Sequence, residues 1–430
     1  MDLDIDLDID LDIEFVRSQF PAFSVPSLKD HAFFENAGGS YTCGQVIDRL
    51  TRYYRERKVQ PYYAFEASRI AGEEMDEARN RLAALMGVES EEVSFGPSTT
   101  QNTYVLAQGF GELLKPGDAV IVTNQDHEAN SGPWRRLADR GIELREWRID
   151  PETGHLPIEG LNALLDGKVK LVCFPHCSNV IAEINPVKEI CDIIRNAGAY
   201  SCVDGVSYAP HGFPNMKSLG ADIYLFSAYK TYGPHQGIMI LRKEIGEQLP
   251  NQGHFFNADT LYKRMTPAGP DHGQIAACAG MADYIDALCY HHQADTKGTS
   301  QQKDRPENAQ NRGIRNNAFA HQLMRRYEKS LLRPVLDYLL EKNSIRVLGP
   351  NNVETRAPTV TICTDGSSAA LAQDLAEKGI MAGNGTFYGN RCLEALGVDL
   401  DRGALRLSFV HYTSQKEVEK LLTALDDVLG

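Results

Sequence analysis

The sequence lacks any apolar run that approaches the roughly 20 residues of a membrane span. It also lacks a basic excess, since 44 lysines and arginines stand against 58 aspartates and glutamates, for a net charge of −14. Without a Lys/Arg cluster in a recognition motif, this balance argues against nucleic-acid and anionic-membrane partners. The opening MDLDIDLDIDLDIEF lacks the basic segment and continuous apolar core of a signal peptide, and nine irregularly spaced cysteines do not form a disulfide framework. We therefore expect a cytoplasmic protein that binds neither nucleic acid nor membrane.

What is present is the composition of a large, soluble globular protein. The chain has 430 residues, of which 42% are hydrophobic and 24% charged, enough for two or three domains. Apolar strands and amphipathic helices alternate from about 90 to 241, and polar residues gather where the strands end. This pattern predicts a mostly parallel sheet with helices on both faces and a ligand beyond the carboxyl ends of its strands.

The stretch 222–241 carries the strongest chemical signal. Its apolar strand ends in Ser227-Ala228-Tyr229-Lys230, and Gly233-Pro234 and a second strand follow, so Lys230 is expected on a short loop at the mouth of the sheet. Taken alone, a loop lysine is usually a solvated one. Upstream, however, another strand ends in Asp204. Pyridoxal phosphate needs such a pair: a lysine for the Schiff base and a carboxylate that keeps the pyridine nitrogen protonated.

A second stretch, 93–102, predicts a strand that runs into a Ser/Thr-rich turn at the start of a helix. Backbone N–H groups, hydroxyls and the helix dipole of such a turn can hold an anion such as phosphate. An ordinary helix cap explains the same residues equally well. A third grouping, Cys173 and Cys177 around His176, could indicate a metal, but Cys173 alternates within a strand, and we expect no metal site.

Four motifs are specific when taken together: DG at 204–205, SAYK at 227–230 followed by YGP, SNV at 178–180, and LRLSFVHY at 405–412. With them the chain resembles the class V aminotransferase superfamily of fold-type I pyridoxal-phosphate enzymes, and within it the cysteine desulfurase-like proteins. The resemblance extends from about 14 to 428, apart from 291–317. It implies an α/β fold of type I, with a mostly parallel seven-stranded sheet between helices and a smaller α+β C-terminal domain. It also implies pyridoxal 5′-phosphate as the cofactor and a homodimer with its active site near the subunit interface.

The resemblance assigns roles to individual residues. Lys230 would form the Schiff base, Asp204 would pair with the pyridine nitrogen, and His127 would stack on the ring. The other implied contacts are with the cofactor phosphate (Thr99, Thr100, Ser227), the ring hydroxyl (Asn179, Ser207), the neighbouring subunit's cofactor (His272) and the substrate (Arg406 for its carboxylate, Asn36, Asn179).

The chain also departs from the desulfurase pattern. Tyr388 stands at the loop position where desulfurases carry the cysteine that becomes a persulfide, and Cys392 lies four residues later on an expected helix. Such an offset is large against the accuracy that nucleophilic attack requires, so we expect no persulfide chemistry. Gly383 stands where a further substrate-binding arginine is common.

The expected organisation has five segments, in chain order: a disordered acidic lead-in (1–13), an N-terminal segment that packs with the small domain (14–35), a large cofactor-binding domain (36–290), an exposed insertion (291–317) and a small C-terminal domain (318–430). The expected function is a pyridoxal-phosphate enzyme that forms a Schiff base with Lys230 and a carbanion at Cα of an amino acid or a derivative. C–S lysis by β-elimination ranks first, with transamination and epimerisation as alternatives. A catalytically silent binding protein of the same fold is the alternative outside enzymes.

Overall fold

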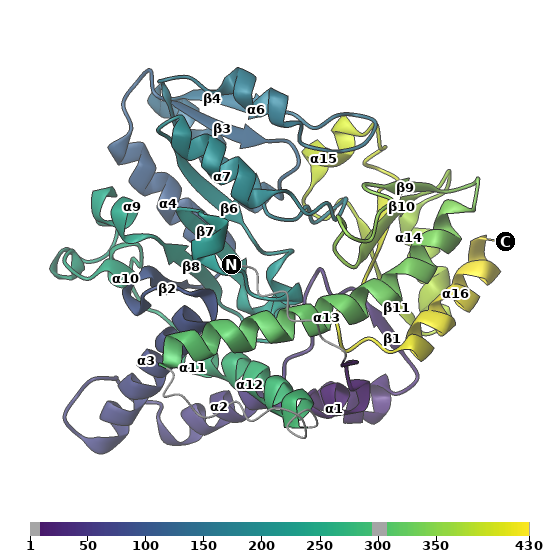
Figure 1. The fold of residues 1–430 in the computed structure, drawn as a ribbon, viewed down its shortest axis with the longest axis horizontal. Helices are drawn as coiled ribbons and strands as arrows, with labels where there is room; N and C mark the ends of the chain where they lie inside the picture. Colours follow the sequence, from purple (N-terminus) through teal and green to yellow (C-terminus); the bar gives the residue numbers. More distant parts are fainter. Residues whose placement is uncertain (1–8, 295–307, 430) are drawn as a thin grey trace.

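The computed structural model describes residues 9–294 and 308–429 (Figure 1). Residues 1–8 of the predicted acidic lead-in and residues 295–307 of the predicted insertion lie outside the described residues. Within the described part, no helix has both the length and the apolar content needed to cross a bilayer.

The large domain is built on a seven-stranded sheet with the order β2-β8-β7-β6-β5-β3-β4. Only β8 runs antiparallel to its neighbours, so the predicted mostly parallel sheet is confirmed. The strands are β2 (Val93–Gly96), β3 (Ala119–Thr123), β4 (Glu143–Trp147), β5 (Val169–Pro175), β6 (Tyr200–Asp204), β7 (Ile223–Ser227) and β8 (Gly237–Leu241).

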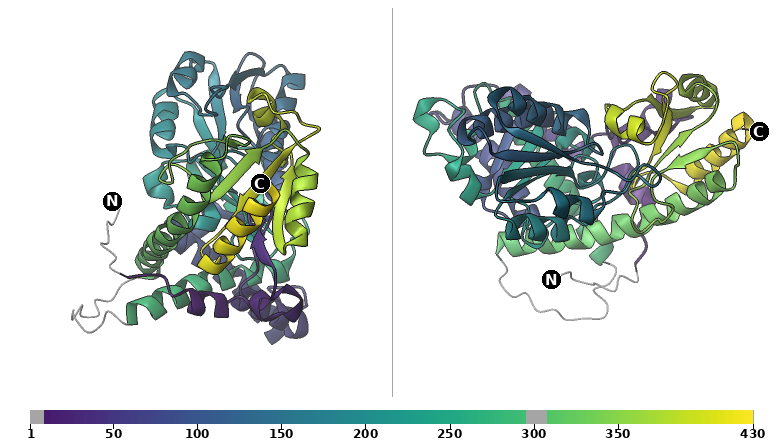
Figure 2. Two further views of the ribbon diagram at one scale, coloured as in Figure 1. Left: turned by 90° about the vertical axis from the view of Figure 1, so that its right-hand side faces the viewer. Right: turned by 90° about the horizontal axis from the view of Figure 1, so that it is seen from above.

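Both faces of this sheet are buried, which explains why its strands are nearly continuous in apolar residues. Along β7, Ile223 and Leu225 enter one core cluster, while Tyr224 and Phe226 enter the other, as the alternation of a strand requires. The first cluster lies against α4 (Thr99–Leu113), and the second lies against α3 (Glu66–Met86), α7 (Val187–Asn196) and α12 (Ala279–Ala294). The sheet is therefore a middle layer between helices (Figure 2).

The small domain contains a five-stranded sheet with the order β1-β11-β12-β10-β9. Its strands are β1 (Ala32–Phe34), β9 (Arg346–Leu348), β10 (Thr359–Cys363), β11 (Ile380–Gly385) and β12 (Ala404–Ser408). The edge strand β1 comes from the N-terminal segment and pairs in parallel with β11. The sheet packs on α14 (Ser368–Glu377) and α16 (Gln415–Leu429).

One helix, α13 (Ala309–Leu340), connects the two domains (Figure 1). Near its start, Asn317 donates to the carbonyls of Leu85 and Phe213 in the large domain. Near its end, Leu332 and Leu336 belong to the core of the small domain.

The described helices extend into both ends of the predicted insertion 291–317, because α12 ends at Ala294 and α13 begins at Ala309. The sequence of α13 reads as polar there, but Gly313 packs against the backbone of Ala84 and Asn316 donates to Asp286. Tertiary contacts thus make a helix where the apolar pattern is weak.

The glycine-rich stretch 383–390 is not a loop throughout, because β11 continues to Gly385. Gly383 pairs with Arg406 of β12, and this ladder supports a strand whose composition does not predict one. Residues 132–140 form α5 (Gly132–Arg135) followed by a 3₁₀ turn. The remaining helices are α1 (Ile13–Ser18), α2 (Gly44–Glu56), α5 (Gly132–Arg135), α6 (Ile158–Leu164), α8 (Met216–Leu219), α9 (Lys243–Gln248), α10 (Leu261–Arg264), α11 (His272–Ala277) and α15 (Asn390–Ala395).

Candidate active site

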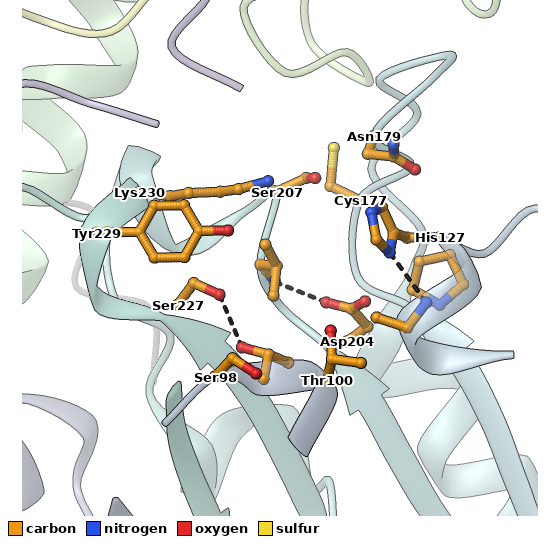
Figure 3. Close-up of a pocket in the computed structure, with 14 residues that line it drawn as sticks. Ser98, Thr100, His127, Cys177, Asn179, Asp204, Ser207, Ser227, Tyr229 and Lys230 are labelled. Atoms are coloured by element: carbon orange, nitrogen blue, oxygen red, sulfur yellow. Dashed lines mark hydrogen bonds between the residues drawn. The ribbon is translucent and has the colours of Figure 1, made fainter. Parts of the chain in front are cut away.

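A cavity opens at the carboxyl ends of β5, β6 and β7, where the sequence placed the ligand (Figure 3). Parallel strands bring their final residues to one edge of a sheet, so side chains that are distant in sequence meet here. The lining residues are Ser98, Thr99, Thr100, His127, Ala129, Pro175, Cys177, Asn179, Asp204, Val206, Ser207, Ser227, Tyr229 and Lys230.

Lys230 lies on the 3₁₀ turn Ala228–Lys230 that directly follows β7. The turn is fixed by a hydrogen bond from the Ala228 N–H to the Gln236 carbonyl and by one from the Ser40 hydroxyl to the Lys230 carbonyl. The Lys230 side chain is only 8% exposed, and its amine has no hydrogen bond or ion pair with the described residues. Burial, together with the charge of Arg406, lowers the pKa of Lys230 to about 8. The amine is therefore partly neutral near neutral pH.

Asp204 is the last residue of β6, beside β7 in the sheet. Its side chain is buried, and one carboxylate oxygen accepts a hydrogen bond of 2.9 Å from the Val206 N–H. Burial raises the pKa of Asp204 to about 6, against the opposing effects of that N–H and of Lys230. Above this pH the cavity contains a buried carboxylate that lacks a close cationic partner among the described residues.

The start of α4 forms another wall of the cavity. Ser98 caps the helix by accepting from the Gln101 N–H, and the Thr99 hydroxyl lies 2.7 Å from that of Ser227. Gly237 lets the start of α4 lie close against β8, since a Cβ at residue 237 would lie 2.5 Å from the Thr99 nitrogen. Hydroxyls and free N–H groups at the N-terminus of a 15-residue helix make this end of the cavity suitable for an anion.

His127 caps a short 3₁₀ turn after β3, where its Nδ1 accepts from the Ala129 N–H at 3.0 Å. Burial, with the charges of Lys230 and Arg406, lowers the pKa of His127 to about 3. The ring is therefore neutral, with its proton on Nε2. It lies tilted against the Tyr388 ring at a centroid distance of 5.3 Å.

Asn179 connects the cavity to the small domain. Its amide nitrogen donates to the Phe387 carbonyl at 2.8 Å, and its backbone carbonyl accepts from Arg406 at 3.0 Å. Its side-chain oxygen is buried without a hydrogen-bond partner in the described chain, an acceptor available to a ligand. Ser207 lines the same cavity.

Three predicted site residues do not line this cavity. Arg406 lies behind Asn179 and forms an ion pair with Glu35 at 2.7 Å. Asn36 lines an adjoining cavity, but its amide donates to the Ser408 and Phe33 carbonyls. The chain itself thus already uses both of these donors. His272 begins α11 and is half-buried away from the cavity.

The sequence did not reveal several residues around the site. Tyr229 stacks on His235 at 4.8 Å, and Ser98 is the helix cap itself. His211 lines the adjoining cavity with Lys230, and its Nδ1 lies 3.0 Å from the buried carboxylate of Glu328 on α13. Only the three-dimensional fold brings His211 and Glu328 together, so no spacing in the sequence could have identified the pair.

The two residues that bear on thiol chemistry lie in different settings, Tyr388 on the loop 386–389 and Cys392 on the helix that follows it. Tyr388 is 73% exposed and has a φ of 55°, whereas Cys392 on α15 is fully buried. Burial raises the pKa of the Cys392 thiol to about 12. Among the described residues, no three His, Cys, Asp or Glu side chains gather as a metal ion would require.

Comparisons with known proteins show which family and which fold this chain is similar to. The model of the family "Aminotransferase class-V" matches residues 32–288 and 315–421. Aminotransferase-like protein FGM3 of Gibberella zeae is 33% identical over 428 residues, covering 97% of this chain and 98% of that protein. A cysteine desulfurase of Serratia proteamaculans is 34% identical over 293 residues, 64% of this chain and 72% of the relative. The apo structure of a cysteine desulfurase from Thermococcus onnurineus has a TM-score of 0.83 at 24% identity and covers 98% of both chains.

Proposed function

The chain belongs to the class-V aminotransferase family, and from this premise we propose that it is a pyridoxal-phosphate enzyme whose cofactor forms a Schiff base with Lys230. Members of this family are generally pyridoxal-phosphate enzymes, and its fold is that of type I. The observation that carries the proposal is the pair of Lys230 and Asp204, both buried and both facing one cavity beyond neighbouring strand ends.

The residues present fit this cofactor. Asp204 would hold a proton on the pyridine nitrogen, because it is a buried carboxylate whose cationic partner is missing from the described residues. The start of α4, with Thr99, Thr100 and Ser227, would hold the phosphate. The neutral His127 would lie on the ring, and the free acceptor of Asn179 would bind near its hydroxyl, beside Ser207.

When bound, the cofactor supplies a protonated ring that withdraws electrons from Cα of the substrate. The chain then has to move a proton at Cα, and Lys230 is the base proposed for this step. Because its pKa is about 8, a useful fraction of the Lys230 amines is neutral near neutral pH. Asp204, ionised above about pH 6, stabilises the positive charge on the ring throughout that range. We also propose that Asn179 contacts the substrate and that Arg406 acts on it from behind Asn179.

The reaction proposed first is β-elimination from an amino acid or an amino-acid derivative, of the C–S lyase type. Cysteine desulfurases among the relatives support it. Transamination is the second candidate, because the relative from Gibberella zeae is named aminotransferase-like. Epimerisation also begins with removal of the Cα proton, and a silent binding protein would show no turnover at all. An assay over a panel of amino acids and derivatives, scored for pyruvate, sulfide, keto acid and inverted stereochemistry, separates these four.

The proposal is tested directly by absorbance. The purified protein should show a band near ~410–430 nm that shifts when amino compounds are added. A protein that neither takes up pyridoxal phosphate nor changes its spectrum would contradict the proposal.

We propose a homodimer as the working form, as the family resemblance implies. Exposed aromatic residues in the α2–α3 region, Tyr54, Tyr62, Tyr63 and Phe65, support a contact there. Tyr54 donates to Asp271, which precedes His272, so this surface is continuous with the residue expected to reach the neighbouring subunit.

The Cys392→Ser variant should retain the wild-type rate, and no persulfide should form on this protein. Cys392 is buried in α15, and its raised pKa leaves almost no thiolate to attack sulfur. The measurement is turnover of wild type and variant, with intact mass after incubation with cysteine and without reductant. A sulfur adduct mapped to Cys392, with activity lost in the variant, would instead indicate a desulfurase with a displaced nucleophile.

Uptake of pyridoxal phosphate by the apoprotein should accelerate as the pH rises and reach a plateau above about pH 8. The reason is that only the neutral amine of Lys230 attacks the aldehyde, and its pKa lies near 8. Stopped-flow absorbance from pH 6 to 10 measures this profile. An ordinary exposed lysine would give a rate that still rises beyond pH 10.

A further inference from the structure

Arg406, the residue expected to hold a substrate carboxylate, already holds one from its own chain. The side chain is 4% exposed on β12, and one terminal nitrogen donates to Glu35 at 2.7 Å. The other terminal nitrogen donates to the Asn179 carbonyl at 3.0 Å. Phe387 covers the guanidinium, whose carbon lies 4.2 Å from the ring centroid. Each terminal nitrogen of the guanidinium therefore has a protein partner, while Nε is buried without a partner in the described chain.

Glu35 is held in this position by the backbone. It directly follows β1 and forms a parallel bridge with Ser408 at the end of β12. Its side chain is 30% exposed and reaches across to Arg406. One carboxylate oxygen is on the guanidinium, and the other is buried without a hydrogen-bond partner in the described chain.

Gly383 provides the space that this carboxylate fills. In the sheet, Gly383 of β11 lies opposite Arg406 of β12. A Cβ at residue 383 would lie 2.2 Å from one oxygen of Glu35 and 2.8 Å from the other. Any side chain at 383 would thus displace the carboxylate. Gly383 stands where a second substrate-binding arginine is common. Its missing side chain leaves the space in which the Glu35 carboxylate lies.

The consequence is electrostatic. Arg406 donates to the backbone carbonyl of Asn179, whose side chain lines the cavity, so the ion pair lies directly behind the cavity wall. In agreement with this position, Arg406 lowers the pKa of Lys230 and Glu35 raises it. With one carboxylate per guanidinium, this end of the site has no net positive charge. A substrate carboxylate placed here would meet Glu35 as a like charge and would find both terminal nitrogens of the guanidinium already bonded to the chain. A neutral group meets neither obstacle.

We infer that Glu35 determines specificity and that the site selects amino compounds whose α-carboxyl group is absent or neutral, as in an amine, amide or ester, over free amino acids. This inference rests on the proposed function and names the class of substrate. It identifies Glu35 as a residue that acts through Arg406.

The experiment compares L-alaninamide with L-alanine on the pyridoxal-phosphate-loaded protein. The dissociation constant of each is taken from the shift of the cofactor absorbance. The wild type should bind the amide at least about tenfold more tightly than the free acid. In Glu35→Gln, which keeps the side-chain size and removes the charge, this preference should fall at least about tenfold through tighter binding of L-alanine. Because the amines of the two probes differ in pKa, the decisive quantity is the change of the ratio between variant and wild type.

Two further variants make the result specific. Gly383→Ala keeps Glu35 in the sequence but takes its space, and it should shift the ratio in the same direction. Glu128→Gln removes an equal charge from a carboxylate that pairs with Arg391 at 3.4 Å, and it should leave the ratio within about twofold.

The outcomes separate the inference from the proposed function. A wild type that responds to both probes but prefers L-alanine, with a ratio unchanged in Glu35→Gln, overturns the inference and leaves the proposed function intact. A protein without a cofactor band, or one whose band responds to no amino compound, overturns the proposed function and the inference with it.

Discussion

Replacing Lys230 with alanine is expected to abolish turnover and to remove the absorbance band of the protein-bound Schiff base. Among the residues that the structure describes, Lys230 is the only lysine that lines the cavity, and it is proposed to serve both as the covalent anchor and as the base at Cα. Removing a positioned base alone costs about 10²–10⁴-fold in rate, and loss of the covalent anchor adds to this. The measurement is kcat with the best substrate of the panel, together with the spectrum after reconstitution with pyridoxal phosphate.

Two control variants sharpen this result. Lys230→Arg keeps a positive charge but cannot form the Schiff base, and it should be as inactive as the alanine variant. Lys188→Ala removes an exposed lysine of α7 that pairs with Asp192, and it should behave as the wild type. An intact Schiff-base spectrum in Lys230→Ala would show that another lysine is the anchor.

Asp204→Asn should still bind the cofactor but lose most of its activity, by about 10²-fold or more. An amide is similar in size but carries no charge, so it cannot hold the proton on the pyridine nitrogen. In the wild type, activity should fall below about pH 8 as Lys230 becomes protonated, and more steeply below about pH 6, because Asp204 then becomes protonated as well. The steeper limb below about pH 6 should be absent from the residual activity of Asp204→Asn, whereas the limb of Lys230 should remain.

Rates of wild type, Asp204→Asn and Asp204→Glu from pH 5 to 8 test this role. The glutamate variant restores the charge and should recover part of the activity, unless the added methylene cannot be accommodated in the buried site. A near wild-type rate in Asp204→Asn would mean that the reaction does not need a protonated ring.

The sequence predicted the large sheet well because its strands are buried on both faces and therefore read as apolar runs, as at β7. It also predicted Lys230, Asp204 and the start of α4, since the ends of parallel strands must meet at one edge. The C-terminal sheet was harder: β11 has the sequence IMAGNG, and pairing with two neighbours, rather than composition, makes it a strand.

The contacts of Arg406 could not have been predicted. Its partner Glu35 lies far away in the sequence, and an acidic residue after a short strand carries no signal of its own. The space at Gly383 appears only when β11, β12 and the end of β1 are assembled side by side. The same is true of His211 and Glu328, which meet across two domains.

The position of β1 at the edge of the C-terminal sheet has a consequence for biosynthesis. The ribosome makes β1 long before β11, the strand with which it pairs. At roughly 5–20 residues per second, the delay is on the order of tens of seconds. During that time the large sheet, with Asp204 and Lys230, can already fold. β1 and Glu35 remain unpaired until β11 and Arg406 have been made. The nascent protein would thus acquire its reactive lysine before the contact that we propose selects its substrate.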